Sequence, residues 1–368
     1  MTMARTGFTD LPLHGGDAPR WLFTRMVSLA EAISEVIIEE MGTEELIKRL
    51  SDPFWFQAFA CVLGFDWHSS GTTTVTCGAL KVALQDSQQL CVAGGKGSTS
   101  KEAPGEIARW VEAQGMHAKR GAGLIRASKL AAKVDSAAVQ DGHQLYHHCF
   151  VFDRIGNWSV VQQGMNGATG YARRYQWFSG KLDSFIDEPH QAITGTRVAS
   201  ALDMTAKAST DCRRACVDLV NDGVERLRRE VVVVEAGQST IEDWCGGGLR
   251  KLHMPRDIDW ETLRKAYEVR PSGYEEMLSI PGIGPSTVRA LALMAELVYG
   301  SGPSWRDPVK FSFTVGGKDG VPYPVDRRAM DHSTQILKAG IDAARLEEKE
   351  RLQAIERLRR FVPPDFSF

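Results

Sequence analysis

The stretch LYHHCFVFDRIGNWSVVQQG, residues 145–164, decides the fold of the first half of this chain. Two runs rich in β-branched and aromatic residues, 145–152 and 158–164, flank the polar segment DRIGN. Gly156 and Asn157 suit a tight turn, because both residue types readily take the backbone conformations that turns need. The pattern therefore predicts a β-hairpin.

Histidines gather at the start of this predicted hairpin, where His143, His147 and His148 lie within six residues. Side chains alternate along a strand, so His147 and His148 are expected to point to opposite faces. His143 would lie about 13 Å from His147 at ~3.3 Å per residue, which is too far for one metal ion to bind all three. One face is predicted to carry Tyr146, His148, Phe150 and Phe152, and the other Leu145, His147, Cys149 and Val151.

The apolar neighbours of His148 predict a core position for it, which leaves His147 as the histidine available for chemistry. A turn beside Gly142 would fold Asp141 back toward His147. Asp141 and His147 are therefore predicted to form an acid–base pair or to bind a metal ion. Three more residues are candidates for the same catalytic site: His143, Gln163 and Asp135.

An arrangement of carboxylate, imidazole and amide side chains on paired strands is similar to the arrangement found in the cores of nucleases. There a carboxylate-bound Mg²⁺ or Mn²⁺ activates water and offsets the charge of the scissile phosphate. The usual nuclease signature, an Asp followed by Glu-x-Lys on the next strand, is absent. The pattern indicates a neighbourhood for a divalent metal without fixing the reaction.

The chain has 368 residues, of which 43% are hydrophobic, and this length predicts two domains rather than one core. Residues 1–197 mix helix and strand patterns, whereas residues 198–368 show mainly helical periodicity. We therefore expect an α+β protein, with an N-terminal mixed α/β domain that carries the chemistry and a C-terminal helical domain that binds DNA.

Charge is balanced, with 44 Lys and Arg against 46 Asp and Glu, so bulk charge alone cannot hold the protein to nucleic acid. The seven cysteines include no CxxC pair, which favours a reducing compartment. No apolar run reaches the roughly 18 residues that a membrane span needs. A cytoplasmic protein without a membrane partner is expected, and the sequence does not indicate its oligomeric state.

Two local segments depart from this balance. The segment YARRYQWFSGK, residues 171–181, interleaves Arg173 and Arg174 with aromatic residues such as Trp177. Cations meet phosphates and rings stack on bases. This segment and a second one, residues 113–134, are therefore predicted to bind DNA, either single-stranded or distorted. A solvated helix face and half-buried core aromatics are the structural alternatives. The other segment, residues 113–134, contains no Asp or Glu but five cations: Lys119, Arg120, Arg126, Lys129 and Lys133.

Glycines also gather in AGGKGSTSKEAP, residues 93–104, just before a predicted helix. Such a loop can present backbone N–H groups to a phosphate. It lacks the GxxxxGK[ST] order of a nucleotide-binding P-loop. Phosphate binding and a plain solvated loop both stay open at this point.

The segment YEEMLSIPGIGPSTVRALALMAELVYG, residues 274–300, predicts a short helix, a glycine-rich turn and a second helix. Gly282 and Gly284 allow backbone conformations that a side chain would forbid, so amides and a helix N-terminus can approach a phosphate. Ser286 and Thr287 begin the second helix and are predicted to lie beside the same DNA. The pattern resembles a helix-hairpin-helix motif, which holds the DNA backbone without reading its sequence.

This hairpin is followed along the chain by PYPVDRRAMD, residues 322–331. That order is similar to the order of motifs in helix-hairpin-helix base-excision glycosylases. That resemblance implies Asp326 as a catalytic carboxylate that stabilises an oxocarbenium-like sugar. The chain departs from those enzymes in three ways. An insertion precedes Asp326, Ser286 and Thr287 stand where a nucleophilic lysine is usual, and no four-cysteine cluster follows. An Asp that caps a helix is the structural alternative.

Over nearly its full length the chain resembles the uncharacterised family known as domain of unknown function 763. The resemblance rests on LPLHGG, SDPFWFQAFACVLGFDWHSSG, QDGHQLYHH, WSVVQQGMN, ARRYQW and GGKDGVPYPVDR, and it implies no activity. The residues themselves favour a DNA-processing repair protein. A metal-assisted nuclease is the first hypothesis, a base-excision glycosylase or lyase the second, and a DNA-binding module without catalysis the third.

Overall fold

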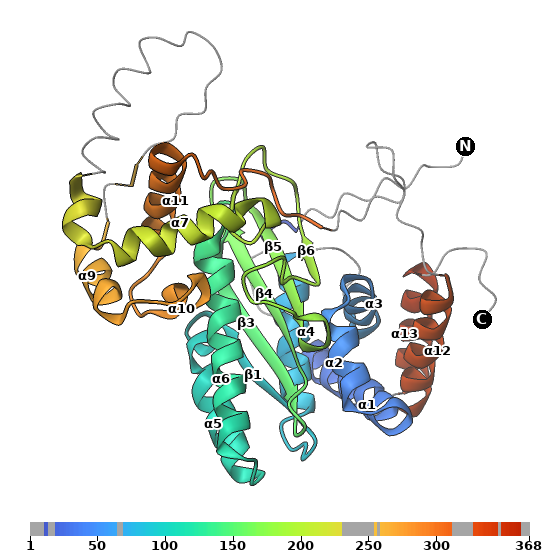
Figure 1. The fold of residues 1–368 in the computed structure, drawn as a ribbon. Coiled ribbons are helices and arrows are strands. Elements are labelled where there is room, and N and C mark those ends of the chain that lie inside the picture. Colours follow the sequence, from blue (N-terminus) through green and yellow to red (C-terminus); the bar gives the residue numbers. More distant parts are fainter. Residues whose placement is uncertain are drawn as a thin grey trace, which may run out of the picture.

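The computed structural model describes residues 11–13, 19–64, 69–229, 254–255, 258–310, 327–344 and 347–361. Its centre is a five-stranded antiparallel sheet with the strand order β1-β3-β4-β5-β6 (Figure 1). This is the mixed α+β class that the sequence predicts. The strands are β1 (Leu90–Lys96), β3 (Gln144–Asp153), β4 (Trp158–Asn166), β5 (Tyr171–Phe178) and β6 (Ala192–Thr194).

β3 and β4 form the hairpin predicted from residues 145–164. The carboxylate of Asp153 accepts hydrogen bonds from the amides of Gly156 and Asn157 at 2.8 and 2.9 Å. Gly156 has a φ of +102°, a conformation that L side chains rarely adopt. The turn residues therefore fix where β3 ends and β4 begins.

A register irregularity lies between Leu145 and His147 of β3. From His147 onward the two faces alternate as predicted, but the predicted faces of Leu145 and Tyr146 are wrong. The Tyr146 hydroxyl accepts a hydrogen bond from Gln163, which is paired with His147, whereas Leu145 packs against a cluster containing Tyr175 on the other face. A β-bulge adds one residue to a strand and so reverses the alternation before it. Periodicity alone does not reveal that extra residue.

Helices cover both faces of the sheet (Figure 1). One face carries Phe150, Phe152 and Trp177 and packs against α5 and α6; we call it the α6 face. The opposite face carries Cys149 and Val161 and packs against α2 and α4; we call it the α4 face. The helices of these two layers are α1 (Arg20–Met41), α2 (Thr43–Ser51), α3 (Pro53–Leu63), α4 (Ser70–Ala83), α5 (Ala103–Ala113) and α6 (Ala118–Lys133).

Short elements connect these layers. The predicted glycine loop folds into a 3₁₀ helix, η1 (Gly97–Glu102), between β1 and α5. α6 runs into a π-helical turn, η2 (Val134–Ala138), which buries Asp135. β2 (Val139–Gln140) follows and pairs with β7 (Leu202–Asp203) in a separate two-stranded sheet. Two further 3₁₀ turns are η3 (Ser179–Lys181) and η4 (Lys207–Ser209).

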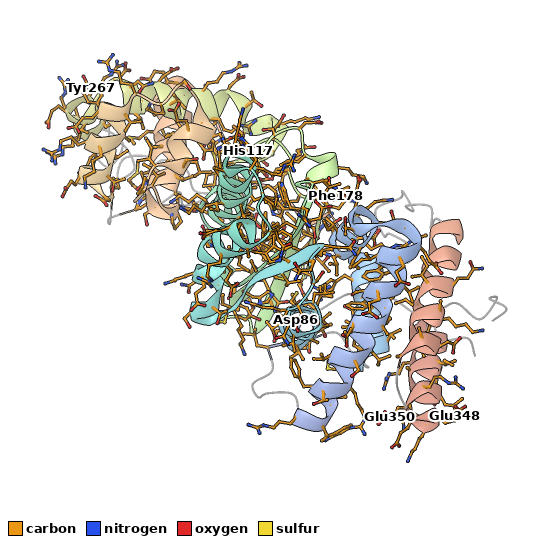
Figure 2. The ribbon with its side chains drawn as sticks, turned by 90° about the horizontal axis from the view of Figure 1, so that it is seen from below. Asp86, His117, Phe178, Tyr267, Glu348 and Glu350 are labelled. Atoms are coloured by element: carbon orange, nitrogen blue, oxygen red, sulfur yellow. The ribbon has the colours of Figure 1, made fainter. Side chains whose placement is uncertain are left out.

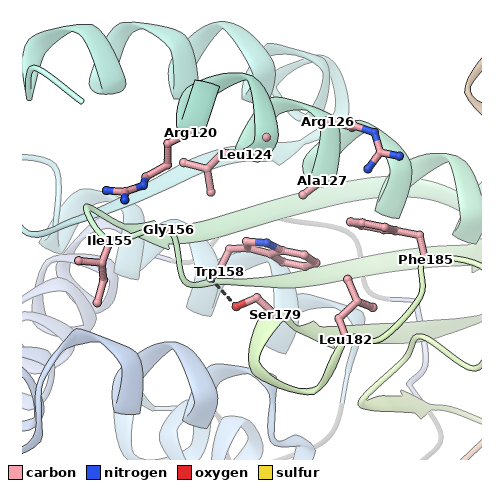
Figure 3. Close-up of a pocket in the computed structure, with 11 residues that line it drawn as sticks. Arg120, Leu124, Arg126, Ala127, Ile155, Gly156, Trp158, Ser179, Leu182 and Phe185 are labelled. Carbon is pink, nitrogen blue, oxygen red and sulfur yellow. Dashed lines mark hydrogen bonds between the residues drawn. The ribbon is translucent and has the colours of Figure 1, made fainter. Parts of the chain in front are cut away.

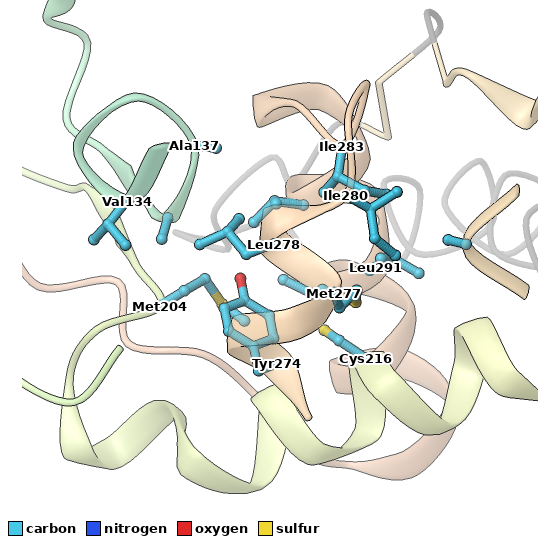
Figure 4. Close-up of a cluster of buried hydrophobic side chains, with 14 of the residues drawn as sticks. Val134, Ala137, Met204, Cys216, Tyr274, Met277, Leu278, Ile280, Ile283 and Leu291 are labelled. Carbon is cyan, nitrogen blue, oxygen red and sulfur yellow. The ribbon is translucent and has the colours of Figure 1, made fainter. Parts of the chain in front are cut away.

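The segment after β7 is mainly helical, as predicted, with α7 (Thr210–Asn221), α9 (Trp260–Val269), α10 (Tyr274–Ser279) and α11 (Pro285–Tyr299). Asp259 caps α9, because its carboxylate accepts a hydrogen bond from the Thr262 amide at 2.9 Å. Figure 4 shows buried side chains of α10, such as Tyr274 and Leu278, beside Cys216 of α7 and Val134 of η2. One hydrophobic cluster therefore runs from the α6 face into these helices, without a gap at residues 197–198.

The last two described helices return to the N-terminal part of the chain (Figure 2). α12 (Arg327–Ala343) packs against α1, and α13 (Glu348–Phe361) packs against α3. Glu350 of α13 forms an ion pair with Arg25 of α1. None of the helices that the structure describes is long and apolar enough to cross a membrane.

Candidate functional site

Two rows of polar side chains cross the sheet on opposite faces. The register pairs His147 of β3 with Gln163 of β4, and Gln163 with Arg174 of β5. Directly opposed residues of antiparallel strands share a face, so these side chains lie together beneath α4. We call the whole set the α4-face row, which comprises Lys96, His147, Gln163, Arg174 and Thr194.

The neighbouring row, on the α6 face, contains His148, Gln162 and Tyr175. His148 Nδ1 lies 2.8 Å from Gln162 Oε1, and its Nε2 lies 2.9 Å from the Ser128 hydroxyl. The carboxamide oxygen can only accept, so the imidazole proton resides on Nδ1. Both His148 nitrogens are satisfied, and the predicted core position of His148 is confirmed by its burial.

Asp135 lies on the α6 face and joins this row to another histidine. Its Oδ2 accepts hydrogen bonds from Gln162 at 2.5 Å and from the Trp177 indole at 3.0 Å. Its Oδ1 lies 2.5 Å from His190 Nε2. Burial raises the pKa of Asp135, and the nearby His190 opposes that rise. The predicted catalytic carboxylate is thus fully enclosed and already bound by three donors.

Asp141 organises a second buried cluster near the start of β3. Its Oδ1 accepts from the His143 amide at 3.0 Å and lies 3.1 Å from His143 Nδ1, while its Oδ2 accepts from Arg173 and Tyr175 at 2.7 Å each. Arg173 also donates two hydrogen bonds to Asp307, at 3.0 and 2.8 Å. Burial alone would raise the pKa of Asp141, but the His143 hydrogen bond and the Arg173 charge outweigh it and lower that pKa to about 2.

The predicted pair of Asp141 and His147 is wrong. Asp141 contacts Arg173 and Tyr175 on the α6 face, whereas His147 lies on the α4 face, so the sheet separates the two side chains. The histidine that Asp141 contacts is His143. Within the described ranges, no group of three or more His, Cys, Asp or Glu side chains could hold a metal ion. The residues therefore do not fit the expected Mg²⁺ or Mn²⁺, which needs several free oxygen ligands.

The prediction that Arg173, Arg174 and Trp177 meet DNA at the surface is also wrong. All three residues are 0% exposed, because β5 lies between β4 and β6 and beneath helices on both faces. Arg173 is paired with two carboxylates, and Trp177 donates to Asp135. The cations and rings of this segment build the interior of the protein.

Arg174 differs from Arg173, because no carboxylate of the described residues pairs with it. Its Nε donates to the Thr73 hydroxyl at 2.8 Å, and its guanidinium lies over the Phe56 ring, 4.6 Å from the centroid. Both terminal nitrogens lack a hydrogen-bond partner within the described chain. Burial lowers the pKa of Arg174 to about 10, which still leaves the side chain charged at neutral pH.

His147 is in a similar position. Only 2% of the residue is exposed, and neither ring nitrogen has a partner among the residues that the structure describes. Burial, together with the positive charge of nearby groups, lowers the pKa of His147 to about 3, so its imidazole is neutral at pH 7. Gln163, predicted as catalytic, is by contrast fully used in holding α4 and β3 together through Thr73, Ser70 and Tyr146.

The outer surface of α6 presents its predicted cations to solvent. Lys119, Arg120, Arg126 and Lys129 are all exposed. Arg126 forms an ion pair with Glu275 of α10, which links α6 to the predicted DNA-binding hairpin. No Asp or Glu in the described part of the chain pairs with Lys119, Arg120 or Lys129. A positive surface therefore lies along α6.

An open groove of about 380 Å³ lies beside α6 (Figure 3). Arg120 and Arg126 of α6 line one side, and Trp158 and Phe185 line another, stacked with their ring centroids 5.9 Å apart. The Arg126 guanidinium lies 5.7 Å from the Phe185 centroid. Cations and aromatic rings do meet in one groove, but on residues other than the β5 segment.

α10 and α11 are joined by the predicted glycine turn. Gly282 has a φ of +95°, and a Cβ there would lie 2.3 Å from the Thr262 hydroxyl, so the turn needs glycine. Gly284 has room for a side chain, with the nearest atom at 3.7 Å. The amides of Gly282 and Gly284 donate no hydrogen bond to any described residue. Ser286 is partly exposed, but Thr287 is buried, so its predicted contact with DNA is wrong.

Tyr175, His190 and Asp307 belong to these buried clusters and were not predicted. Tyr175 lies two positions after Arg173, so recognising β5 as a strand would have placed both on one face. Asp307 is 134 residues from Arg173 along the chain, and no local pattern connects them. Asp326, the glycosylase candidate, lies outside the described residues.

The fold and these clusters define an α+β protein whose central antiparallel sheet is covered on both faces and crossed by buried polar rows. The family model described as protein of unknown function (DUF763) matches residues 7–325, and the chain belongs to that family. No curated protein and no solved structure matches the chain.

Proposed function

We propose that the protein binds DNA through the exposed cations of α6 and the glycine turn between α10 and α11. The carrying observation is that Lys119, Arg120 and Lys129 are exposed without acidic partners in the described chain, beside an ion pair that joins α6 to α10. Unpaired surface cations attract phosphates by counterion release, which is independent of base sequence. The protein is thus proposed to act in DNA processing as a backbone-binding protein.

The groove beside α6 favours single-stranded or distorted DNA. Its partly exposed Phe185 ring lies beside the Arg126 guanidinium, so an unstacked base could contact that ring while its phosphate contacts a cation. Bases of an intact duplex are already stacked on each other. Binding is therefore expected to be tighter to single strands and flaps than to a duplex of equal length.

The α6 surface is tested by measuring the affinity for labelled single-stranded, flapped and duplex DNA over a range of salt concentrations. Lys119→Glu with Arg120→Glu should weaken binding at least tenfold and reduce the salt slope by about 2, one for each lost phosphate contact. The matched control is Arg20→Glu with Lys48→Glu, the same change of charge on α1 and α2. Equal losses in the two double variants would show that only net charge matters, and would refute the α6 surface.

The glycine turn is tested separately with Gly284→Val. The position has space for a side chain, so the variant should fold, yet a bulky group would block phosphates from the neighbouring amides. Affinity should fall alike for all DNA sequences. Gly282→Ala is the comparison, because its Cβ would collide with Thr262 and should lower the melting temperature. Unchanged affinity in a folded Gly284→Val protein contradicts the role of this turn.

DNA hydrolysis is a second candidate function, carried by the contact between Asp141 and His143. A carboxylate 3.1 Å from Nδ1 can orient an imidazole, as in acid–base catalysis. His143→Gln is the clean variant, since Asp141 also holds Arg173. If labelled DNA is cleaved, His143→Gln should abolish cleavage without loss of DNA affinity. Cleavage that survives this change, or that chelators abolish, argues against this pair.

A further inference from the structure

The α4-face row contains a buried positive charge that the described residues leave unbalanced. The side chains around the Arg174 guanidinium are neutral: the Thr73 hydroxyl, the Phe56 ring, and the Cys77, Cys61 and Tyr146 groups. Removing an ion from water costs several kcal/mol unless a counter-ion and hydrogen bonds replace the lost hydration. Arg173, one residue earlier, has two carboxylates for this purpose, and Arg174 has none in the described chain.

The polar nitrogens of this row that lack partners lie on one face of the sheet. The two terminal nitrogens of Arg174 and both ring nitrogens of His147 are buried and without partners in the described structure. His147 is separated from Arg174 by one strand and lies directly opposite Lys96 of β1. Lys96 is exposed and forms no ion pair with any residue that the structure describes. The row therefore runs from a buried guanidinium to a solvated ammonium.

A crevice of about 250 Å³ opens at the Lys96 end of this row. It lies between α4 and β1, and Lys96, Thr74 and Thr99 line it together with the thiols of Cys77 and Cys149. Cys77 lies one helical turn after Thr73, which accepts the hydrogen bond from Arg174. Cys149 lies two residues after His147 on the same face of β3, so the inner wall of the crevice is near both Arg174 and His147. Glycines at positions 94 and 95 form part of the wall and belong to residues 93–104, for which the sequence leaves both phosphate binding and a plain solvated loop open.

We propose that the α4-face row is a binding site for a phosphate group, either free phosphate or the end of a small phosphomonoester. The ligand would enter by the crevice, with Lys96 at the mouth and the Arg174 guanidinium and His147 N–H as inner donors. A guanidinium offers two parallel N–H groups that match two oxygens of a phosphate. Two cations, Arg174 and Lys96, balance a dianion, whereas a carboxylate or chloride would neutralise only one of them. The site is separate from the proposed DNA surface, which is the solvent-exposed side of α6.

The test is the melting temperature of the full chain with increasing inorganic phosphate, at constant ionic strength maintained with chloride. Phosphate should raise the melting temperature of the wild type saturably, because it binds only the folded state. In Arg174→Met this phosphate effect should vanish, while the melting temperature without phosphate should be equal to or above that of the wild type. Methionine fills the space without a buried charge. Lys96→Ala should weaken phosphate binding by about tenfold, the loss of one charged contact.

Three comparisons make the outcome decisive. Lys101→Ala, an exposed lysine of the same loop that does not line the crevice, should keep the full phosphate effect. The double variant Lys119→Glu with Arg120→Glu should also keep the full phosphate effect. Failure of the DNA-binding proposal would therefore leave the phosphate-site proposal standing. Ribose 5-phosphate in place of phosphate distinguishes the source: tighter binding identifies a phosphomonoester, and equal or weaker binding identifies free phosphate.

The proposal is overturned if phosphate gives no saturable stabilisation beyond chloride. It is also overturned if Arg174→Met retains the phosphate effect, or if this variant is less stable than the wild type in phosphate-free buffer. The last result would mean that the guanidinium is already satisfied by the protein itself.

Discussion

Arg173 and Arg174 are adjacent in β5 and equally buried, yet the two faces of the sheet treat them differently. On the α6 face, Arg173 donates to Asp141 and Asp307, and each carboxylate is held by further donors. On the α4 face, Arg174 has one hydroxyl and one aromatic ring. In the first arrangement two carboxylates balance the charge of Arg173, and only its Nε lacks a hydrogen-bond partner among the described residues. In the second, no described carboxylate balances the charge of Arg174, and both of its terminal nitrogens lack partners within the described chain. This difference separates a structural polar cluster from a candidate binding site.

The same contrast applies to the adjacent histidines. His148 on the α6 face uses both ring nitrogens, on Gln162 and Ser128. His147 on the α4 face uses neither within the described chain. Since interior polar groups are nearly always hydrogen-bonded, unsatisfied groups concentrated on one face need an explanation. A bound ligand would explain them by supplying the missing hydrogen-bond partners. Variants on each face test whether the two faces differ in this way.

The largest expected effect is on the α6 face. Arg173→Met leaves Asp141 and Asp307 buried without their cation and should lower the free energy of unfolding by about 3–5 kcal/mol. Chemical denaturation of this variant beside Arg174→Met measures the difference between the faces directly. If the two variants lose similar stability, the distinction between a paired and an unpaired arginine is incorrect.

The next effect is a dependence of stability on pH that comes from the α4 face. Burial lowers the pKa of His147 to about 3, below its value near 6.5 in an unfolded chain. The unfolded state therefore binds a proton that the folded state does not, and stability falls as pH drops from about 6.5 toward 3. His147 alone should contribute a slope of about 1.4 kcal/mol per pH unit in this window.

His147→Gln should remove this part of the slope between pH 4 and 6. Asp141, whose pKa is about 2, loses its stabilising charge only as pH falls from about 4 toward 2, so it does not interfere in that range. Denaturation curves in phosphate-free buffer would measure both proteins. A slope unaffected by the substitution would mean that His147 is solvated or partnered in solution.

The smallest expected effects come from removing one buried hydroxyl group on each face of the sheet. Ser128→Ala removes the partner of His148 Nε2 and should cost about 1–3 kcal/mol, because the nitrogen stays buried and unpaired. Thr194→Val removes a buried hydroxyl that has no partner in the described chain, and should be neutral or stabilising by up to about 1 kcal/mol. Thermal melts suffice for both. A costly Thr194→Val would indicate a hidden partner for the α4-face row.

Local features of the fold were predictable because the responsible residues are near each other in sequence. The hairpin of residues 145–164 followed from its alternation and from the glycine in its turn. The turn at Gly282 followed in the same way. The core position of His148 followed from Phe150 and Phe152 on the same face.

The site was predicted less well, for two physical reasons. A single bulge near Tyr146 changed which side chains share a face before it, and the position of β5 inside the sheet buried cations that composition placed at the surface. Asp141 was predicted to work with His147, but its partners are His143 and Arg173.

The sequence by itself determined the hairpin of residues 145–164 and the glycine turn at Gly282, and it supplied the polar doublets at residues 147–148, 162–163 and 173–174. Only the tertiary structure decided what these doublets do. Alternation sends the two members of each doublet to opposite faces, and strand register aligns them into rows. Whether a buried arginine finds a carboxylate then depends on distant residues such as Asp307, because burial and charge pairing are long-range properties of the packed chain.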